Sequence, residues 1–285
     1  MPAALGIGIT TYNRSRHLET CLARVRELTA PPFHLVVADD GSTDETQALC
    51  AHQNVTCITG KNMGIAWNKN RALFFLDRIM ECDVIILLED DSYPNNFGWQ
   101  ANWVEGAERW GHANFAVEPL RADFLSGEGS VVHPYVSSSV SGQCAAFSHS
   151  ALSVCGYLDS RFKGYGYEHA EHSARLVRSG FGGEMKISKR GEEDPHFYLL
   201  AADLSVSPVE SYRDEDSLDA NWLAWTKMYG DPTYRHPWRT RAEFRQFRCE
   251  INTATRQTDF SLARRLMLAA KWNRWRRAIG SFPTR

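Results

Sequence analysis

The chain has 285 residues, of which 43% are hydrophobic and 23% charged, as in a globular protein of one large domain or two closely packed ones. No apolar run approaches the roughly 18 to 20 residues that cross a bilayer, which argues against an integral membrane protein. The seven cysteines are widely spaced without a CxxC pair, and no secretory leader precedes the first predicted strand. We therefore expect reduced thiols and a cytoplasmic protein.

Short apolar strands alternate with helices in the first part of the chain. We expect strands over residues 5–10, 33–38, 55–59 and 84–88, and helices after the first strand, near 45–52 and over 65–80. This alternation predicts an α/β fold in which helices cover both faces of a parallel sheet. Ligands of such sheets bind beyond the carboxyl ends of the strands, where polar and acidic residues follow all four predicted strands.

The pattern after residue 95 is less regular. We expect a helix over 97–110, loops with short strands over 113–140, a strand over 141–147 that enters a helix at 148–155, and a helix over 168–179 closed by Gly180. Residues 200–260 are ambiguous, and 259–279 read as a helix capped by Asp259 or Ser261. The chain shows no internal repeat and no low-complexity linker.

Three adjacent acids, Glu89, Asp90 and Asp91, follow the fourth predicted strand. Two carboxylates about 5 Å apart repel by roughly 3 kcal/mol at an effective dielectric of about 20. A bound cation is the simplest way to neutralise them. The alternative is that Asp91 or Ser92 caps a following helix, although a cap needs only one acid.

Several motifs together resemble the GT-A fold glycosyltransferases, most closely their inverting family 2. The segments are GITTYNRSRHLETCL, VVADDGSTDET, NMGIAWNKNRAL and ILLEDDSYP, followed by SGQCAAFSHSALSVCGYLDSRF and GYGYEHAEHSARLVRSGF. The resemblance covers roughly residues 5–200 and implies a Rossmann-like mixed sheet flanked by helices. It divides the chain into a nucleotide-sugar-binding half (1–95), an acceptor-binding half (96–200) and a helical C-terminal extension (201–285).

The resemblance also implies how a nucleotide sugar, expected to be UDP-linked, would bind. Thr10 and Tyr12 would flank the base, Asp40 or else Asp39 would accept from its imino group, and Lys69 or Arg71 would reach a phosphate. Asn62 and Gly64 belong to the same edge. Glu89 or Asp90 would face the ribose, and Asp91 would bind Mn²⁺ or Mg²⁺, hard cations that select carboxylate and phosphate oxygens. A histidine beyond the acidic helix often supplies another metal ligand; His196 is the first candidate here and His236 the second.

The general base of an inverting transfer would lie in the acidic helix, whose usual pattern in the family is Glu-Asp-x-Asp. This sequence has Glu168-His169-Ala170-Glu171, so a histidine stands where the family often has its catalytic aspartate. Glu168, His169 and Glu171 are all candidates for the base, and we favour Glu168. A zinc helix is a poor fit, because His169 and His172 are three residues apart rather than four.

The acceptor site would lie between the 141–147 strand and the 165–168 turn, with Tyr165, Tyr167 and either Trp99 or Trp103 as faces for sugar stacking. The predicted function is metal-dependent transfer of a sugar to a saccharide or lipid-linked saccharide. A nucleotidyltransferase that makes the sugar nucleotide and a noncatalytic sugar-nucleotide-binding protein are the alternatives.

The C-terminal segment differs in charge from the rest of the chain. The net charge of −2 combines +7 and no acid in residues 261–285 with −9 in residues 1–260. Residues 261–279 could therefore contact an anionic membrane surface through Trp272 and Trp275, or pack on the acidic body. Nucleic acid is a poor partner for so acidic a body without a reading motif.

Overall fold

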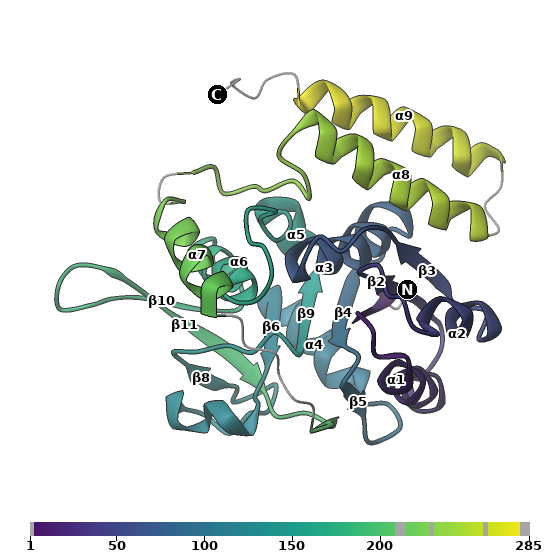
Figure 1. The fold of residues 1–285 in the computed structure, drawn as a ribbon. Helices are drawn as coiled ribbons and strands as arrows, with labels where there is room; N and C mark the ends of the chain where they lie inside the picture. Colours follow the sequence, from purple (N-terminus) through teal and green to yellow (C-terminus); the bar gives the residue numbers. More distant parts are fainter. Residues whose placement is uncertain (1–2, 209–214, 229–230, 259–261, 280–285) are drawn as a thin grey trace.

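The computed structural model describes residues 3–208, 215–228, 231–258 and 262–279 (Figure 1). Its centre is a ten-stranded mixed sheet in the order β3-β2-β1-β4-β9-β6-β11-β8-β7, with β10 paired to β11. The strands are β1 (Leu5–Thr11), β2 (Phe33–Asp39), β3 (Thr56–Thr59), β4 (Val84–Glu89), β6 (His112–Phe115), β7 (Phe124–Ser126), β8 (Tyr135–Ser137), β9 (Cys144–Ser148), β10 (Gly183–Ile187) and β11 (Glu193–Leu200). A separate pair consists of β5 (Ser92–Pro94) and β12 (Leu204–Val206).

The four strands predicted in the first part of the chain are confirmed, and they are parallel to one another. Their register aligns Thr10 with Glu89 and Thr11 with Asp39, so their carboxyl ends meet at one edge of the sheet. β9 then runs antiparallel to β4, which makes the sheet mixed and brings Gln143 and Cys144 to the same edge.

Helices cover both faces of this sheet (Figure 1). They are α1 (Ser15–Leu28), α2 (Thr46–His52), α3 (Ile65–Phe74), α4 (Gln100–Trp110), α5 (His149–Cys155), α6 (Glu168–Arg178), α7 (Glu215–Thr226), α8 (Arg241–Gln257) and α9 (Leu262–Ile279). The single helix expected over 65–80 changes to a π-helix, η1 (Phe75–Ile79), and a 3₁₀-helix, η2 (Glu118–Asp123), lies in the loop-rich region.

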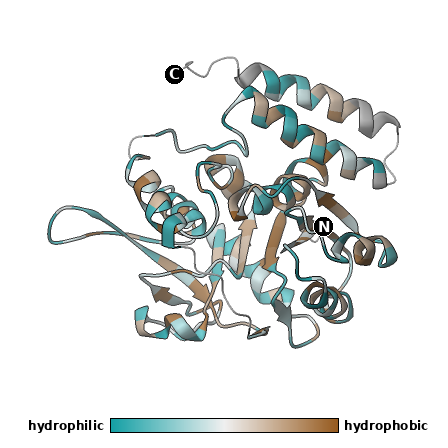
Figure 2. Ribbon diagram, viewed as in Figure 1, coloured by the Kyte–Doolittle hydropathy of each residue, from teal (hydrophilic) through white to brown (hydrophobic). Residues whose placement is uncertain are grey.

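Side chains of the central strands point alternately to the two faces of the sheet and pack in two hydrophobic cores. In Figure 2 the central strands are largely brown, which marks hydrophobic residues. Ile86 and Leu88 pack with α1 and α4, whereas Ile85 and Leu87 face α3, α5, α6, α8 and α9. Gly6 and Gly8 belong to this packing. A Cβ at Gly8 would lie 2.8 Å from the Cβ of Ala72, so the glycine lets α3 approach β1 closely.

The aromatic residues of α9 face the body of the protein. Trp272 is 4% exposed and stacks on Phe74 at 5.5 Å, and the Trp275 ring lies 5.0 Å from the same phenylalanine. The idea that these tryptophans insert into a membrane is therefore wrong, and α9 packs on the body. The proposed caps Asp259 and Ser261 lie outside the described residues. No helix within the described ranges combines the length and apolarity needed to cross a bilayer.

Candidate active site

The strand ends form a polar edge to which β1 contributes Thr10 and Tyr12. Thr10 is buried and its hydroxyl donates to the carbonyl of Leu88 at 3.3 Å. Tyr12 follows the end of the strand and is 45% exposed, so a face of its ring is open to solvent. Asn62 is also exposed and Gly64 partly so. These are the accessible members of the predicted donor-binding set.

The two acids after β2 are engaged inside the protein. Asp39 is fully buried and accepts from the Ser42 N–H at 3.0 Å and from the Thr59 hydroxyl at 2.8 Å. Asp40 accepts from the backbone N–H groups of Met63 and Gly64 at 3.0 and 2.9 Å. Burial raises the pKa of Asp40, against these N–H groups and Arg71, which lower it. Asp40 therefore fixes the loop after β3 against the end of β2.

Arg71 is fully buried, which removes it as a ligand for a phosphate in the crevice. Its guanidinium donates to Asp40 at 2.8 Å and to Glu250 of α8 at 3.0 Å. Glu250 also accepts from the indole N–H of Trp67 at 3.0 Å. The C-terminal extension thus closes a buried ion network directly behind the donor edge, a role that the sequence did not reveal.

The acidic triplet has three different environments. Glu89 is the most exposed of the three and pairs with Lys69 at 2.8 Å. Asp90 is 2% exposed and accepts from the Thr11 hydroxyl at 2.6 Å. Asp91 is 7% exposed. Arg14 lies 3.4 Å from Asp90 and 3.6 Å from Asp91, so one guanidinium offsets two of the three charges.

Crowding of these acids perturbs their titration. Burial raises the pKa of Asp90 to about 7, against the lowering effects of Thr11 and Arg14, and the charges of Asp91 and Glu89 add to the rise. Burial and the charge of Glu89 likewise raise the pKa of Asp91. A cation bound at this edge would favour the ionised forms of both acids and lower their pKa values.

The donor chemistry of this edge fits a hard divalent cation, because carboxylate oxygens are what Mg²⁺ and Mn²⁺ select. No group of three or more His, Cys, Asp or Glu side chains within the described ranges is arranged to hold a metal ion. The protein would thus contribute one or two carboxylates, Asp91 first, and leave positions for phosphate oxygens and water, as is usual for Mg²⁺.

The predicted histidine ligands are not brought to Asp91. His196 lies on β11, three strands from β4, which corresponds to about 14 Å across the sheet, and it pairs with Asp194 at 3.3 Å. His236 packs between the rings of Tyr234 and Trp238.

Lys69 joins the donor edge to the acidic helix. Its ammonium group is buried, donates to Gly142 O at 2.9 Å and lies 2.8 Å from Glu89 and 4.0 Å from Glu168. Burial alone would lower the pKa of Lys69, but the two carboxylates outweigh it and the pKa lies above its ordinary value. The two acidic centres, 79 residues apart in sequence (89 and 168), therefore share one buried cation.

Glu168 begins α6, 3% exposed, with its two oxygens in unlike environments. His169 Nδ1–H donates to Oε1 at 3.1 Å, whereas Oε2 is buried and has no hydrogen-bond partner. His169 Nε2 lies 3.1 Å from Val140 O. Since a carboxylate and a carbonyl are both acceptors, satisfying both contacts requires a doubly protonated imidazole. Burial alone would raise the pKa of Glu168, but His169 and Lys69 lower it to about 2.

Glu171, the third candidate base, is engaged elsewhere. Arg175 donates to both of its oxygens, at 2.9 and 3.0 Å, and both residues are buried. His172 Nε2–H donates to Gly156 O at 3.0 Å, and burial lowers the pKa of His172. Of the three candidates, Glu168 is the one with an unpartnered carboxylate oxygen.

On the acceptor side, two of the predicted stacking residues are core residues. Trp99 and Trp103 are 1% and 0% exposed, so neither can stack on a sugar. Tyr167 instead lies beside Trp222 and Trp225 of α7, with ring centroids 5.5 and 5.7 Å away, and Trp222 is 54% exposed.

α7 is tied to the turn before α6 by one buried amide. Asn221 accepts from Lys163 N at 3.1 Å and donates to the carbonyls of Lys163, Tyr165 and Gly166 at 2.8 to 3.1 Å. The sequence pattern over residues 200–260 does not predict this helix. The local pattern around this asparagine, SLDANWLAW, gives little indication of what the helix packs against.

Comparison with known proteins agrees with this geometry. Residues 7–109 match the family described as Glycosyl transferase family 2. A mannosyltransferase from Pyrobaculum calidifontis, solved with GDP-Man and Mn²⁺, is 15% identical with a TM-score of 0.56; the match covers 96% of this chain and 83% of that one. GalNAc-T7, solved with UDP, GalNAc and Mn²⁺, is 13% identical with a TM-score of 0.57, over 80% and 48% of the respective chains. No curated protein matches the sequence.

The matched segment spans β1 to α4 and therefore includes the donor edge and the acidic triplet. The solved structures share the arrangement of the sheet and its helices over most of the chain. Residues 7–109 thus resemble family 2 glycosyltransferases, and most of the chain shares the fold of the two solved glycosyltransferases.

Proposed function

We propose that this enzyme transfers a sugar from a nucleotide sugar to a saccharide hydroxyl in one inverting displacement that depends on Mn²⁺ or Mg²⁺. The acceptor is a free or lipid-linked saccharide, and we keep the prediction of a cytoplasmic enzyme, since all seven cysteines are free thiols. The observation that carries the proposal is the unpartnered, buried Oε2 of Glu168, a residue that Lys69 links to Glu89 of the acidic triplet.

The acceptor proton would move to Glu168. Its pKa of about 2 keeps the carboxylate ionised before the reaction, and Oε2 has a free lone pair for an incoming hydroxyl. His169 and Lys69 hold Oε1 from the other side and fix the direction of Oε2. His169 acts as a positioning residue, because a doubly protonated imidazole has no lone pair with which to take a proton.

The donor would lie along the strand ends. Tyr12 offers an open ring face to the base, next to Thr10 and the loop that holds Asn62 and Gly64. Asp39 and Asp40 would act mainly by holding that loop, because their oxygens are already bonded within the protein. Glu89 and Asp90 would face the ribose, and Asp91 would hold the metal ion, which as a Lewis acid stabilises the departing diphosphate.

UDP is our expected nucleotide, and GDP is the alternative, since one structural relative was solved with each. The base contact would be made by Tyr12 stacking, which accepts either ring system. A direct comparison of the two nucleotides therefore belongs in the test.

The test measures the midpoint of thermal unfolding with UDP, GDP, ADP or CDP, each with Mn²⁺, Mg²⁺ or a chelator. We expect one nucleotide to raise the midpoint only when a metal ion is present, and Asp91→Ala to abolish that rise. Glu105→Ala, which removes an exposed acid from α4, serves as a control and should respond like the wild type. Binding by Asp91→Ala as tight as that of the wild type, with metal present, would refute the metal assignment.

A further inference from the structure

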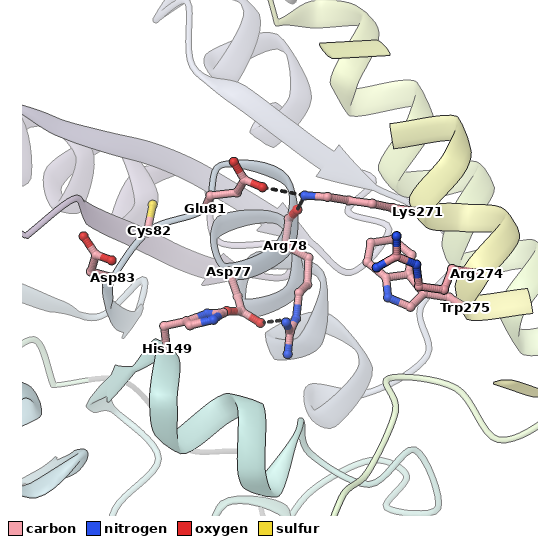
Figure 3. Close-up of a pocket in the computed structure, with 9 residues that line it drawn as sticks. All are labelled: Asp77, Arg78, Glu81, Cys82, Asp83, His149, Lys271, Arg274 and Trp275. Carbon is pink, nitrogen blue, oxygen red and sulfur yellow. Dashed lines mark hydrogen bonds and ion pairs between the residues drawn. The ribbon is translucent and has the colours of Figure 1, made fainter. Parts of the chain in front are cut away.

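A second cavity of about 430 Å³ lies between the sheet and the C-terminal helix (Figure 3). Its nine lining residues come from η1, the segment before β4, the start of α5, and α9. Cavities of this size are typical of small-molecule sites. Because β4 begins just after Asp83 and ends at Glu89, the cavity and the acidic triplet lie at opposite ends of one strand, about 20 Å apart.

The acids of this cavity each have a partner within the protein. Asp77 is fully buried and accepts from His149 at 2.6 Å, from Arg78 Nε at 2.7 Å and from the Tyr157 hydroxyl. Glu81 pairs with Lys271 at 2.5 Å. Asp83 accepts from the backbone N–H of Ala4 at 2.8 Å. The buried acid, Asp77, is therefore fully engaged.

The cations keep donors that these contacts do not use. Arg78 lines the cavity; its Nε bonds Asp77 and Tyr157, as Figure 3 shows for Asp77, and its guanidinium also bonds Tyr234. Arg274 has no hydrogen bond or ion pair with any described residue, and its guanidinium lies beside Trp275 at the cavity. The hydrogen bond to Asp77 raises the pKa of His149, which favours another positive charge at the rim.

We propose that this cavity binds a phosphate ester. Two guanidinium groups, on η1 and on α9, line one cavity, and a phosphate monoester has enough free oxygens to accept from both. The cavity is larger than a phosphate ion, and the ring of Trp275 provides an apolar wall for the organic part of the ligand. The ester is either a soluble molecule or the headgroup of an anionic lipid.

The exposed arginines of α9 supply a matched pair of variants. Arg274 lines the cavity, whereas Arg276 is exposed on the same helix and does not. Glycerol 3-phosphate is titrated by calorimetry into the wild type, Arg274→Gln and Arg276→Gln at constant ionic strength. We expect the wild type and Arg276→Gln to bind alike and Arg274→Gln to bind about tenfold more weakly, as for the loss of a hydrogen bond to a charged group.

This comparison does not depend on the nucleotide or on turnover, so it stands whatever the outcome at the catalytic edge. Glycerol 3-phosphate that binds near Lys69 instead would give the same binding signal in all three proteins. Unliganded thermal midpoints show whether each variant is folded. No saturable binding by the wild type, or equal affinity in all three proteins, would overturn the proposal.

Vesicles separate the two sources of the phosphate. The three proteins are sedimented with vesicles of phosphatidylcholine alone or mixed equally with phosphatidylglycerol. A loss of binding to the mixed vesicles that is selective for Arg274→Gln identifies a lipid headgroup. Selectivity confined to glycerol 3-phosphate identifies a soluble ester. An Arg274→Gln variant that matches Arg276→Gln with both probes contradicts a phosphate site.

Discussion

Replacing Glu168 by glutamine tests the centre of the proposed mechanism. The amide has the shape of the carboxylate and can still accept from His169 through its oxygen, but it cannot take a proton from the acceptor. A general base contributes about 10² to 10⁴ in rate, or about 3 to 5 kcal/mol of transition-state stabilisation. Because the pKa of Glu168 is about 2, the carboxylate is fully ionised at neutral pH, so the whole factor should be lost from kcat.

The assay has a binding arm and a turnover arm. Nucleoside diphosphate release is followed with saturating donor and acceptor, and donor binding is followed by the rise in thermal midpoint with nucleotide and metal. We expect Glu168→Gln to keep the binding signal. His169→Asn removes the positioning cation but leaves the base, so its kcat should fall less than that of Glu168→Gln.

The reverse order would refute this assignment. If Glu168→Gln keeps activity within about tenfold of the wild type while His169→Asn is inactive, then the histidine is the base and the doubly protonated imidazole inferred from its two acceptor contacts is wrong. Loss of nucleotide binding by Glu168→Gln would instead indicate that Glu168 supports the donor edge.

Three further outcomes concern stability. Folding lowers the pKa of Glu168 from 4.5 to about 2, so the ionised carboxylate contributes about 3 kcal/mol to the free energy of unfolding. This contribution is present above pH 4.5 and is lost as the pH falls toward 2. Glu168→Gln should therefore flatten the pH dependence of urea unfolding in this range, and an unchanged pH dependence would count against the shift. Arg71→Met removes the ion-pair partner of Asp40 and Glu250 and should lower the free energy of urea unfolding by about 3 to 5 kcal/mol. Part of this loss should be recovered in Arg71→Met/Glu250→Gln. If the losses of the two single variants simply add in the double variant, Arg71 and Glu250 are not coupled. Gly64→Ala places a Cβ 2.9 Å from Gly164 N at a φ of +90°, whereas Gly98 has a φ of +80° in open space, so Gly64→Ala should lower the thermal midpoint more than Gly98→Ala; equal losses would show that the contact does not matter.

The donor edge could be predicted from sequence because short stretches of neighbouring residues specify it. Each of the first strands is a short apolar run that ends in polar residues, and parallel strands bring those ends together whatever the rest of the fold does. The ends of β1, β2 and β4 therefore meet as expected, with Thr10 aligned with Ala38 and with Glu89. The partners of Asp40 could not be predicted, because they are backbone N–H groups, which no pattern of side chains indicates.

Contacts across long sequence separations could not be predicted. Arg71 meets Glu250, 179 residues later, and nothing in either segment specifies that α8 rather than a phosphate neutralises the guanidinium. His196 was placed near Asp91 by its distance along the chain, but β11 enters the sheet three strands away. The segment that contains Trp272 and Trp275 has the basic and aromatic composition of a membrane-facing helix. Both tryptophans nevertheless pack against Phe74 in the body of the protein, a contact that the local sequence does not indicate.

Lys69 lies between Glu89 of the donor edge and Glu168, the proposed base, and its buried ammonium group can therefore act on both donor departure and proton transfer. Before transfer, Glu168 is negative and Lys69 and His169 balance it. As the acceptor proton reaches Glu168, that negative charge disappears, while an equal charge develops on the departing diphosphate beside the acidic triplet. A cation already held between the two sites stabilises the charge at both ends of this shift without having to move far. Lys69→Met should therefore impair kcat and nucleotide binding together, whereas Glu168→Gln impairs kcat alone.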